Sequence, residues 1–375
     1  MMTLKSSTTT TKHNWTIISH LATLCTLLVL YLHFYQDWTL DETGLSRNIK
    51  MDKFLKTYPA ESSQGANPFD PLTTEQRLRK HYPYDQKTNT KTRIPKKIWQ
   101  MWRFSPTEKN FPYADLHDKW TKLNPNFKYN FQTNAELIDL ICEKFKYTVP
   151  EVAYALESLP SLILKADFSR YLVLFLYGGA YSDLDVNLLV PMDDWFDTNR
   201  DVGLVIGMEN DGTGDNPTPL LDQIENWFFK AKPRHPVLAK LIATVVKNTF
   251  EAHDKGLVPD DKDHQDSERC SRFNVLSWTG PFVLSHVVHA HINSLQNPTI
   301  VDTRVERSRY CIERVNKHAP EIPRGAGFNL HTVKCLAGPL VVNDIVIYPM
   351  YVLRGYDDSK ECYINHLYHG SWKAA

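Results

Sequence analysis

The chain has 375 residues, and its 43 Lys and Arg residues balance 43 Asp and Glu residues, so its formal net charge at pH 7 is zero. A nucleic-acid-binding protein needs clustered cations that neutralise several phosphates, so this balance argues against nucleic acid as a partner. Hydrophobic residues make up 42% of the chain and charged residues 23%, a composition that excludes overall disorder and suits one large globular domain or two small ones.

The first predicted element is a membrane-spanning helix over residues 15–36. No Lys, Arg, Asp or Glu occurs between His13 and Gln36, and at about 1.5 Å per residue the segment spans a hydrocarbon core of about 30 Å. Lys5 and Lys12 precede it, whereas acidic residues follow it. The positive-inside rule then predicts a cytosolic tail at residues 1–14 and a luminal remainder. A cleaved signal peptide is the alternative, but no small-residue cleavage site follows Tyr35.

Residues 37–92 are polar and weakly patterned, which predicts a luminal stem with room for a helical segment over 73–81. Five cysteines follow the predicted span: Cys142, Cys270, Cys311, Cys335 and Cys362. They provide for two disulfides and one remaining thiol, but their spacing assigns no pairs. No CxxC pair occurs, which argues against a structural zinc site.

From residue 93 to residue 375 the pattern indicates one catalytic domain in which strands alternate with helices. Strands are predicted at 98–102, 127–131, 180–186, 203–209 and 345–348. Helices are predicted at 135–145, 152–158, 161–177, 220–231, 237–250 and 281–292. This alternation predicts an α/β sheet with the functional site along one of its edges.

The most informative segment contains Asp183 and Asp185, two residues apart near the end of a predicted strand. Alternate strand residues point the same way, so both carboxylates can approach one cation. Such oxygen ligands suit Mn²⁺ or Mg²⁺, with phosphates completing the coordination. A calcium EF-hand loop is excluded because Leu188 and Asp194 stand where it requires Gly and Glu. A structural carboxylate pair without metal remains the alternative.

Two further charges, Asp167 and Arg170, lie three residues apart on a predicted helix that is otherwise apolar. Charges on a helix that is buried nearly all round are unfavourable unless they are partnered. A surface ion pair is the simple alternative. The functional interpretation is a carboxylate that holds sugar hydroxyls beside a guanidinium that holds phosphate.

Several segments together resemble one enzyme family. They are Ile94–Trp102, Lys165–Tyr171, Tyr177–Tyr181 with the two acids that follow, Ala231–Pro236, Thr279–Pro281, Ile347–Pro349 and Gly370–Trp372. From about residue 94 to 373, and in this order, the chain resembles the yeast Och1-type α-1,6-mannosyltransferases, DXD-containing enzymes of glycosyltransferase family 32. The resemblance implies a single Rossmann-like, nucleotide-sugar-binding domain of the GT-A type, preceded by one transmembrane helix. It also implies a single-pass type II protein of the Golgi membrane with a luminal catalytic domain.

The reaction implied by the resemblance is transfer of mannose from GDP-mannose to an N-glycan acceptor of the mannan outer chain, with retention and with Mn²⁺. Asp183 and Asp185 would hold the Mn²⁺ and the diphosphate. Asp167 and Arg170 would contact the transferred sugar and its phosphate.

The resemblance also assigns residues to the nucleotide and the diphosphate. Trp102 matches a position that lines the nucleotide pocket, and Gln100 lies on the same face of its strand. Ser371 and Trp372 match the C-terminal pair, in which the aromatic side chain closes over the donor phosphates.

The C-terminus departs from the family pattern. Relatives often carry two adjacent His residues before the Ser-Trp pair, whereas here the second of these positions is Leu367. His366 and His369 are therefore both candidate metal ligands, and His366 is favoured by its place in the pattern. A packing or surface histidine is the alternative for each.

Two other functions stay open. One is a different family 32 enzyme: a sphingolipid mannosyltransferase, a galactosyltransferase or a glucosaminyltransferase. The other is a non-catalytic subunit of a mannan-making mannosyltransferase complex, although such a subunit would be expected to lose one of the four charged residues at 167, 170, 183 and 185, and all four are present.

Overall fold

The computed structural model describes residues 71–84, 93–108, 111–198, 200–210, 223–254, 275–296, 298–302, 333, 336, 338–354 and 361–369. The chain divides into two units, Lys50–Leu367 and a second unit formed by Met1–Ile49 with Tyr368–Ala375. None of the helices in the described ranges is long and apolar enough to cross a membrane. The span predicted at residues 15–36 lies outside these ranges.

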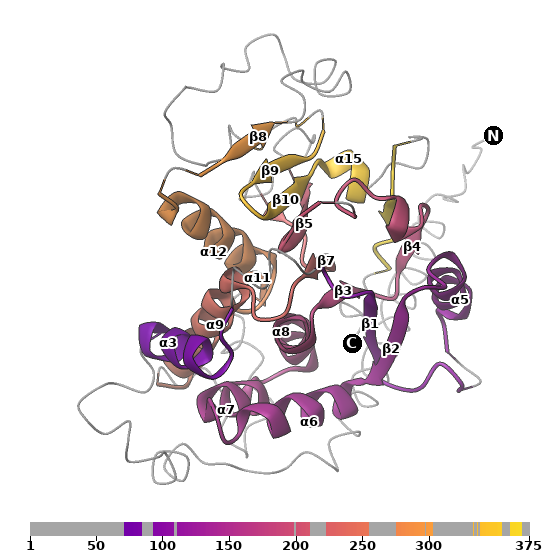
Figure 1. The fold of residues 1–375 in the computed structure, drawn as a ribbon. Helices are drawn as coiled ribbons and strands as arrows, with labels where there is room; N and C mark the ends of the chain where they lie inside the picture. Colours follow the sequence, from indigo (N-terminus) through magenta and orange to yellow (C-terminus); the bar gives the residue numbers. More distant parts are fainter. Residues whose placement is uncertain are drawn as a thin grey trace, which may run out of the picture. The chain divides into compact units, whose positions relative to one another are not determined.

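A mixed nine-stranded sheet is the centre of the first unit (Figure 1). Its strands run in the order β2-β1-β3-β7-β5-β10-β9-β8, and β6 pairs with β5 beside this path. Their bounds are β1 Lys97–Trp102, β2 Lys128–Thr133, β3 Gly179–Ser182, β5 Leu204–Asn210, β6 Gln223–Ile224, β7 Phe228–Ala231, β8 Ile300–Asp302, β9 Leu340–Val342 and β10 Ile345–Tyr348. Strand β1 is parallel to β2 and β3, and β5 is parallel to β10, whereas the other pairs are antiparallel. The predicted α/β class is confirmed as a mixed sheet that is consistent with the GT-A fold.

Helices and a small second sheet pack against the large sheet. Contacts with the strands come from α6 Asn134–Phe145, α8 Leu162–Tyr177 and α12 Pro281–Ser294, with α7 Pro150–Ser158, α9 Pro236–Asp254 and α11 Val275–Trp278 packed on these helices. The other elements are α5 Ala114–Leu123, η3 Met192–Asp194, α15 Met350–Leu353 and a two-stranded sheet of β4 Val186–Leu188 and β11 Ile364–His366. Buried residues of α5, η3, β4 and β11 form one apolar cluster with residues of β1, β3, β7 and β10. The small sheet therefore packs directly on the large one.

A pair of glycines turns the chain from α8 into β3. Gly178 and Gly179 have φ angles of 63° and 108°, in the region that disfavours a side chain. A Cβ on Gly179 would lie 2.7 Å from the carbonyl oxygen of Lys97 in the neighbouring strand. The tight turn and the close approach to β1 fix where β3 begins, and Asp183 follows directly after this four-residue strand.

Two predicted elements differ from the structure. The helix predicted at 220–231 is wrong, because its described residues form β6, a short connection and β7. All four residues of β7 are buried, the charged Lys230 included, and a segment that is buried on both faces carries no periodicity to separate strand from helix. The strand predicted at 180–186 ends early, at Ser182, and the chain turns before β4 begins at Val186.

Helix α3 (Pro71–His81) lies within the segment assigned to the stem and packs against α9. Leu78 is completely buried, and Arg77 forms an ion pair with the buried Glu151. Just after the helix, Tyr84 donates a hydrogen bond to Asp344 Oδ2 at 3.0 Å. The folded unit therefore includes residues before 93.

A chain that begins at residue 93 is expected to be less stable than one that begins at residue 70, by about 3–5 kcal/mol, because it leaves the buried Glu151 without its partner. Urea unfolding of the two truncated chains measures this difference. Equal midpoints would mean that α3 contributes nothing to the fold. Arg79→Ala, which removes only an exposed i,i+4 pair with Glu75, serves as a control with little expected change.

Cys142 and Cys362 are buried and form no disulfide, and burial raises the pKa of Cys142. Two disulfides among the five cysteines that follow the predicted span are therefore excluded, since only three remain available for pairing. Those three, Cys270, Cys311 and Cys335, lie outside the described residues.

Candidate active site

Asp183 and Asp185 occupy the turn between β3 and β4. The N–H of Asp183 donates to the carbonyl oxygen of Trp227 at 2.8 Å, and the N–H of Leu367 donates to the carbonyl oxygen of Asp185 at 2.9 Å. The turn is therefore held on one side by the connection between β6 and β7, and on the other side by the end of β11. The two acids do not lie on a strand as predicted, but the turn still brings their carboxylates together.

His366 completes this group. Strand β11 pairs antiparallel with β4, with His366 opposite Val186, so its imidazole lies beside the turn. One ligand atom each from Asp183, Asp185 and His366 can be chosen so that all three lie within 4.8 Å of one another, and His366 Nε2 lies 3.3 Å from Asp185 Oδ1. Two carboxylates and one imidazole suit a divalent cation such as Mn²⁺. Among the described residues, these three form the group that could hold a metal.

The other C-terminal candidates, His369, Ser371 and Trp372, are not placed beside this group by the structure. His369 belongs to the second unit of the chain, and its role as a ligand stays a prediction. Ser371 and Trp372 lie outside the described residues, so their predicted contact with the donor phosphates also stays a prediction.

Asp167 and Arg170 lie on α8 and are both 4% exposed, so the surface ion pair is excluded. Arg170 Nη2 lies 2.9 Å from Asp167 Oδ1 and 3.5 Å from Asp183 Oδ1. Arg170 Nη1 donates to the carbonyl oxygen of Asn226 at 2.8 Å. The Arg170 guanidinium thus links α8, the group of Asp183, Asp185 and His366, and the connection between β6 and β7.

Three further side chains join this network. Tyr181 donates to Asp183 Oδ1 at 2.9 Å, and its ring lies under the Arg170 guanidinium at 5.1 Å. Asn226 Nδ2 and Thr279 Oγ1 donate to the two oxygens of Asp167, at 3.2 and 3.3 Å. Tyr181 and Thr279 belong to the segments that resemble the enzyme family, but the sequence did not show what they contact. Asn226 gave no signal, because it fell inside a predicted helix.

Comparison with known proteins places this arrangement in a family. Residues 113–201 match the family model described as a glycosyltransferase sugar-binding region containing a DXD motif. The chain is 30% identical over 327 residues to the initiation-specific alpha-1,6-mannosyltransferase of Candida albicans, covering 81% of this chain and 77% of the relative. The Saccharomyces cerevisiae protein of the same name is 25% identical, over 90% of this chain and 88% of that one. The putative glycosyltransferase HOC1 of that yeast is 29% identical, over 59% and 54%.

The chain belongs to this glycosyltransferase family. The resemblance seen in the sequence is confirmed, and the protein is an enzyme of the glycosyltransferase class. Such DXD enzymes generally use a divalent cation and a nucleotide sugar, and the Asp-Asp-His group has the donor set for the cation.

The electrostatics of the transferase site favour a bound cation. Burial raises the pKa of Asp167 to about 7, and the Arg170 charge opposes this rise. Burial also raises the pKa of Asp183, and the nearby Asp185 carboxylate adds to the rise while Arg170 and His366 oppose it. Asp167 and Asp183 thus share one guanidinium, and the charge of Asp185 adds to theirs. A divalent cation would offset the remaining negative charge and hold the carboxylates ionised.

An aromatic group adjoins the DXD turn of the transferase. Trp102, at the end of β1, packs edge-to-face on Tyr113 with ring centroids 5.2 Å apart, and Tyr113 clusters with Phe111 and Leu184 of the turn. The Trp102 Nε1 atom is buried and has no hydrogen-bond partner among the described residues. Flat aromatic surface and an unused donor suit a nucleobase.

Gln100 contacts groups within the protein, and its predicted contact with the donor stays a prediction. It is 1% exposed, its Nε2 donates to the carbonyl oxygen of Asp183 at 3.3 Å, and its Oε1 accepts from the Tyr129 hydroxyl. Both ends of the amide are therefore used within the protein, and Gln100 supports the DXD turn from the strand beneath it.

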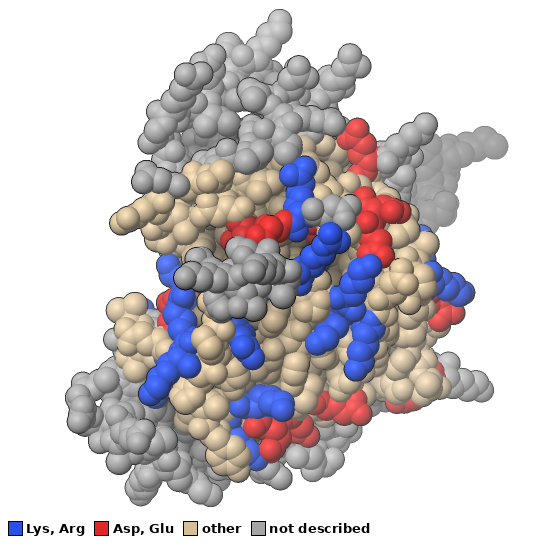
Figure 2. Space-filling model, viewed as in Figure 1, with Lys and Arg blue, Asp and Glu red and all other residues tan. Residues whose placement is uncertain are grey.

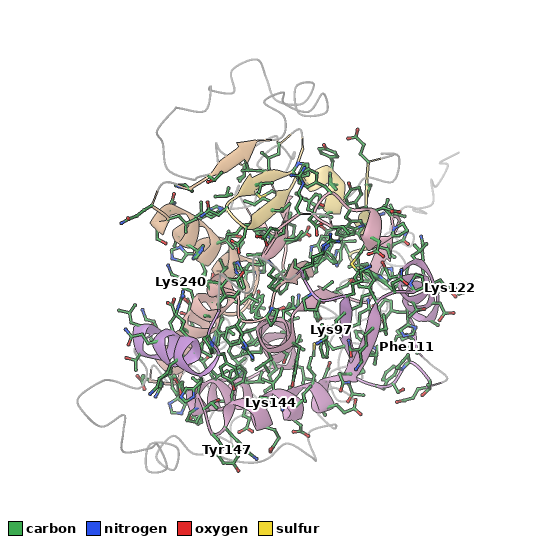
Figure 3. The ribbon with its side chains drawn as sticks, in the orientation of Figure 1. Lys97, Phe111, Lys122, Lys144, Tyr147 and Lys240 are labelled. Atoms are coloured by element: carbon green, nitrogen blue, oxygen red, sulfur yellow. The ribbon has the colours of Figure 1, made fainter. Side chains whose placement is uncertain are left out.

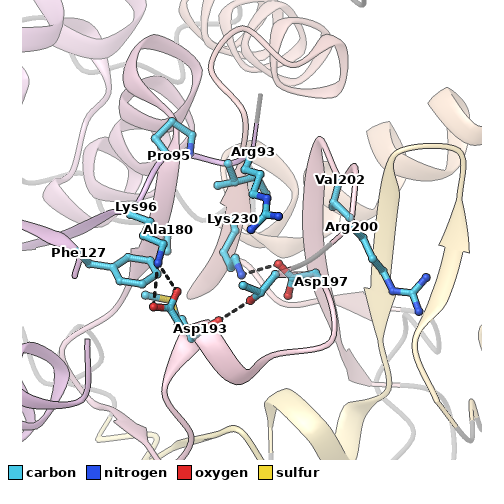
Figure 4. A pocket seen from close by; sticks show the side chains of 13 residues that line it. Arg93, Pro95, Lys96, Phe127, Ala180, Asp193, Asp197, Arg200, Val202 and Lys230 are labelled. Carbon is cyan, nitrogen blue, oxygen red and sulfur yellow. Dashed lines mark hydrogen bonds and ion pairs between the residues drawn. The ribbon is translucent and has the colours of Figure 1, made fainter. Parts of the chain in front are cut away.

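A pocket at the opposite end of β1 is not this site (Figure 4). It is lined by the residues that precede β1, by Ala180 at the start of β3 and by Lys230. Lys230 Nζ lies 2.5 Å from Asp197 Oδ2, and Lys96 Nζ lies 2.7 Å from Asp193 Oδ1. Figure 2 shows Lys and Arg side chains spread over the face in view, and Figure 3 labels Lys97, the first residue of β1. The DXD turn follows the other end of the strands.

Glu225, beside Asn226, is a buried carboxyl that the site leaves unpaired. It is completely buried, and neither of its side-chain oxygens has a hydrogen-bond partner among the described residues. Gly207 makes room for it, since a Cβ there would lie 2.5 Å from Glu225 Oε1. Burial raises the pKa of Glu225 well above 4.5; the Glu209 carboxylate adds to this rise, and Arg354 opposes it.

Glu225→Gln is expected to make the stability of the protein less dependent on pH. A carboxyl whose pKa is higher in the folded state stabilises the fold fully below its unfolded pKa, near 4.5. That stability is lost as pH rises toward the folded value, by up to about 1.4 kcal/mol per pH unit. The amide does not titrate, so the variant should gain stability relative to the wild type between about pH 5 and about pH 8. Urea unfolding at both pH values measures this gain. The same gain in Glu143→Gln, a surface control on α6, would contradict the assignment to Glu225.

Proposed function

We propose that the protein is an α-1,6-mannosyltransferase that transfers mannose from GDP-mannose to an N-glycan acceptor, with retention and with Mn²⁺ as the metal. The observation that carries the proposal is the contact between the two charged groups. Arg170 joins Asp167 of the buried helix to Asp183 of the Asp-Asp-His group. The sugar and the linkage in this proposal come from the names of the relatives, which are alpha-1,6-mannosyltransferases.

In the proposed reaction, the bond between C1 of mannose and the diphosphate oxygen breaks while the acceptor hydroxyl forms the new bond to C1 from the same face. The acceptor proton goes to a donor phosphate oxygen, so no protein carboxylate has to act as nucleophile. A divalent cation, when bound, supplies charge that stabilises the departing diphosphate. The positions of Asp183, Asp185 and His366 suit them to hold it.

Arg170 and Asp167 orient the donor in this proposal. The guanidinium is buried and fixed by three partners, so it offers charge to the phosphates without reorganising as the bond breaks. Asp167 accepts hydrogen bonds from Asn226 and Thr279 and keeps lone pairs for sugar hydroxyls. Trp102 and its aromatic neighbours would hold the guanine. We further propose that residues 15–36 anchor the enzyme in the Golgi membrane, with the transferase domain in the lumen.

The test is an assay of the full chain, solubilised in detergent, with GDP-mannose, Mn²⁺ and a mannose-rich N-glycan. The expected product carries one additional α-1,6-linked mannose, identified by linkage analysis. A β-linked product would contradict retention, and transfer only from UDP-galactose or UDP-N-acetylglucosamine would contradict the donor. A mannosyl adduct trapped on a protein carboxylate would contradict the same-face mechanism.

A further inference from the structure

Trp227 touches both sides of the Asp-Asp-His group. It lies between β6 and β7 and is 4% exposed. Its carbonyl oxygen accepts the hydrogen bond from the N–H of Asp183 at 2.8 Å. Its indole ring stacks on the imidazole of His366, with ring centroids 4.6 Å apart and an interplanar angle of 20°. One residue therefore contacts the DXD turn through its main chain and the histidine through its side chain.

The stacking bears on how an imidazole binds metal. A histidine ligand offers the lone pair of one ring nitrogen, so the ion must lie near the plane of the ring and in line with that nitrogen. The pairing of β11 with β4 fixes the main chain of His366, but two side-chain torsions remain free. A flat indole against one face of the imidazole restricts both torsions. In the observed orientation, Nε2 points toward Asp185.

The indole nitrogen of Trp227 separates this residue from tryptophans that only fill the core. Trp120 and Trp195 belong to the same apolar cluster, and their Nε1 atoms donate to main-chain oxygens at 2.8 and 2.9 Å. Trp99 and Trp278, also buried, donate through Nε1 as well. Trp227 Nε1 is buried without a partner among the described residues. Buried tryptophan normally occurs where its N–H finds an acceptor, so hydrogen bonding does not account for tryptophan at this position.

We propose that Trp227 is a positioning residue of the metal group: its ring holds the His366 imidazole in the orientation that binds the cation. This inference rests on the proposed function, because it takes Asp183, Asp185 and His366 as ligands. It adds a residue that touches neither the ion nor the substrate. Trp227 acts through His366, and its effect on metal affinity should disappear when the imidazole is absent.

The experiment is a double-mutant cycle on Mn²⁺ binding by the full chain in detergent, with Mn²⁺ alone as the probe and its electron paramagnetic resonance signal as the readout. His366→Ala and Trp227→Leu should each raise the Kd for Mn²⁺, by about tenfold for a lost ligand or its support. The double variant should bind within about twofold of His366→Ala alone, because coupled residues are not additive. Trp227→Phe, which keeps an aromatic plane on the imidazole, should stay within about twofold of the wild type.

Trp195→Leu is the matched control, since it removes a buried indole from the same cluster without touching His366. It should lower the melting temperature as Trp227→Leu does and leave the Kd for Mn²⁺ unchanged. A wild-type Kd in Trp227→Leu, or additive effects in the double variant, would overturn the role of Trp227 alone. An unchanged Kd in His366→Ala would overturn the Asp-Asp-His assignment and, with it, this inference.

Discussion

Asp183→Asn and Asp185→Asn should each lower kcat/KM for mannosyl transfer by about 10³-fold, because each removes a charged ligand from the ion that stabilises the leaving diphosphate. Each substitution keeps the shape of the side chain and removes one of the two neighbouring carboxylates of the turn. Folding should therefore be preserved, with a melting temperature close to that of the wild type. In the wild type, EDTA should abolish activity and Mn²⁺ should restore it, whereas added Mn²⁺ should rescue neither variant fully.

Asp193→Asn is the control for these two variants. Asp193 is a partly exposed carboxylate paired with Lys96 beside β1, at the end of the sheet away from the DXD turn. Its loss should leave kcat, KM and metal dependence unchanged. Near-normal turnover in either the Asp183 or the Asp185 variant, measured at saturating GDP-mannose, would contradict the metal assignment.

Arg170→Lys has the second large expected effect, on both catalysis and stability. The guanidinium contacts Asp167, Asp183 and the carbonyl oxygen of Asn226 at once, and a lysine ammonium cannot reproduce this planar set of contacts. We expect kcat to fall by about 10²–10³-fold, as for other lost transition-state donors. The free energy of unfolding should fall by about 3–5 kcal/mol if the buried Asp167 is left without its partner.

Steady-state kinetics and urea unfolding of Arg170→Lys separate these two effects. Asp167→Asn in the same background is informative, because removing the unpaired carboxylate should restore part of the stability without restoring kcat. A lysine variant with wild-type kcat would show that positive charge alone is sufficient at this position, and the argument from planar geometry would then be wrong.

Most of the fold near the site could be predicted from local patterns. Strand β1 and helix α8 were predicted because an apolar run after Pro95 and a long apolar segment that ends at Gly178 leave few alternatives. Strand β7 was predicted as a helix, since its four residues are all buried and show no alternation that separates a strand from a helix. Helix α3 was expected only as a helical segment of the stem. Its place in the folded unit depends on contacts with α9, on the buried Leu78 and on an ion pair with Glu151 of α7, which no local pattern reveals.

In the candidate site too, residues with a local sequence signal were predicted, and residues that depend on distant contacts were not. The sequence pointed to Asp167, Arg170, Asp183 and Asp185 because charges that stand within apolar segments are rare and need a partner. Their contacts with Asn226 and Thr279 depend on which strands neighbour each other, and β3 lies beside β7 only in the assembled sheet. Hydrogen-bonding amides and hydroxyls are common in every loop. Without the sheet order nothing distinguished Asn226, and the resemblance included Thr279 without giving it a role.

Because β11 supplies His366 and the hydrogen bond that closes the Asp185 side of the turn, the metal group depends on a segment that is synthesised after the whole large sheet. The nine strands of the large sheet all precede β11, so they can assemble before it emerges from the ribosome. A nascent chain, or the product of a premature stop codon after residue 353, would then carry both acids of the DXD turn without the imidazole. The enzyme would gain its activity only after β11 has been synthesised and has paired with β4.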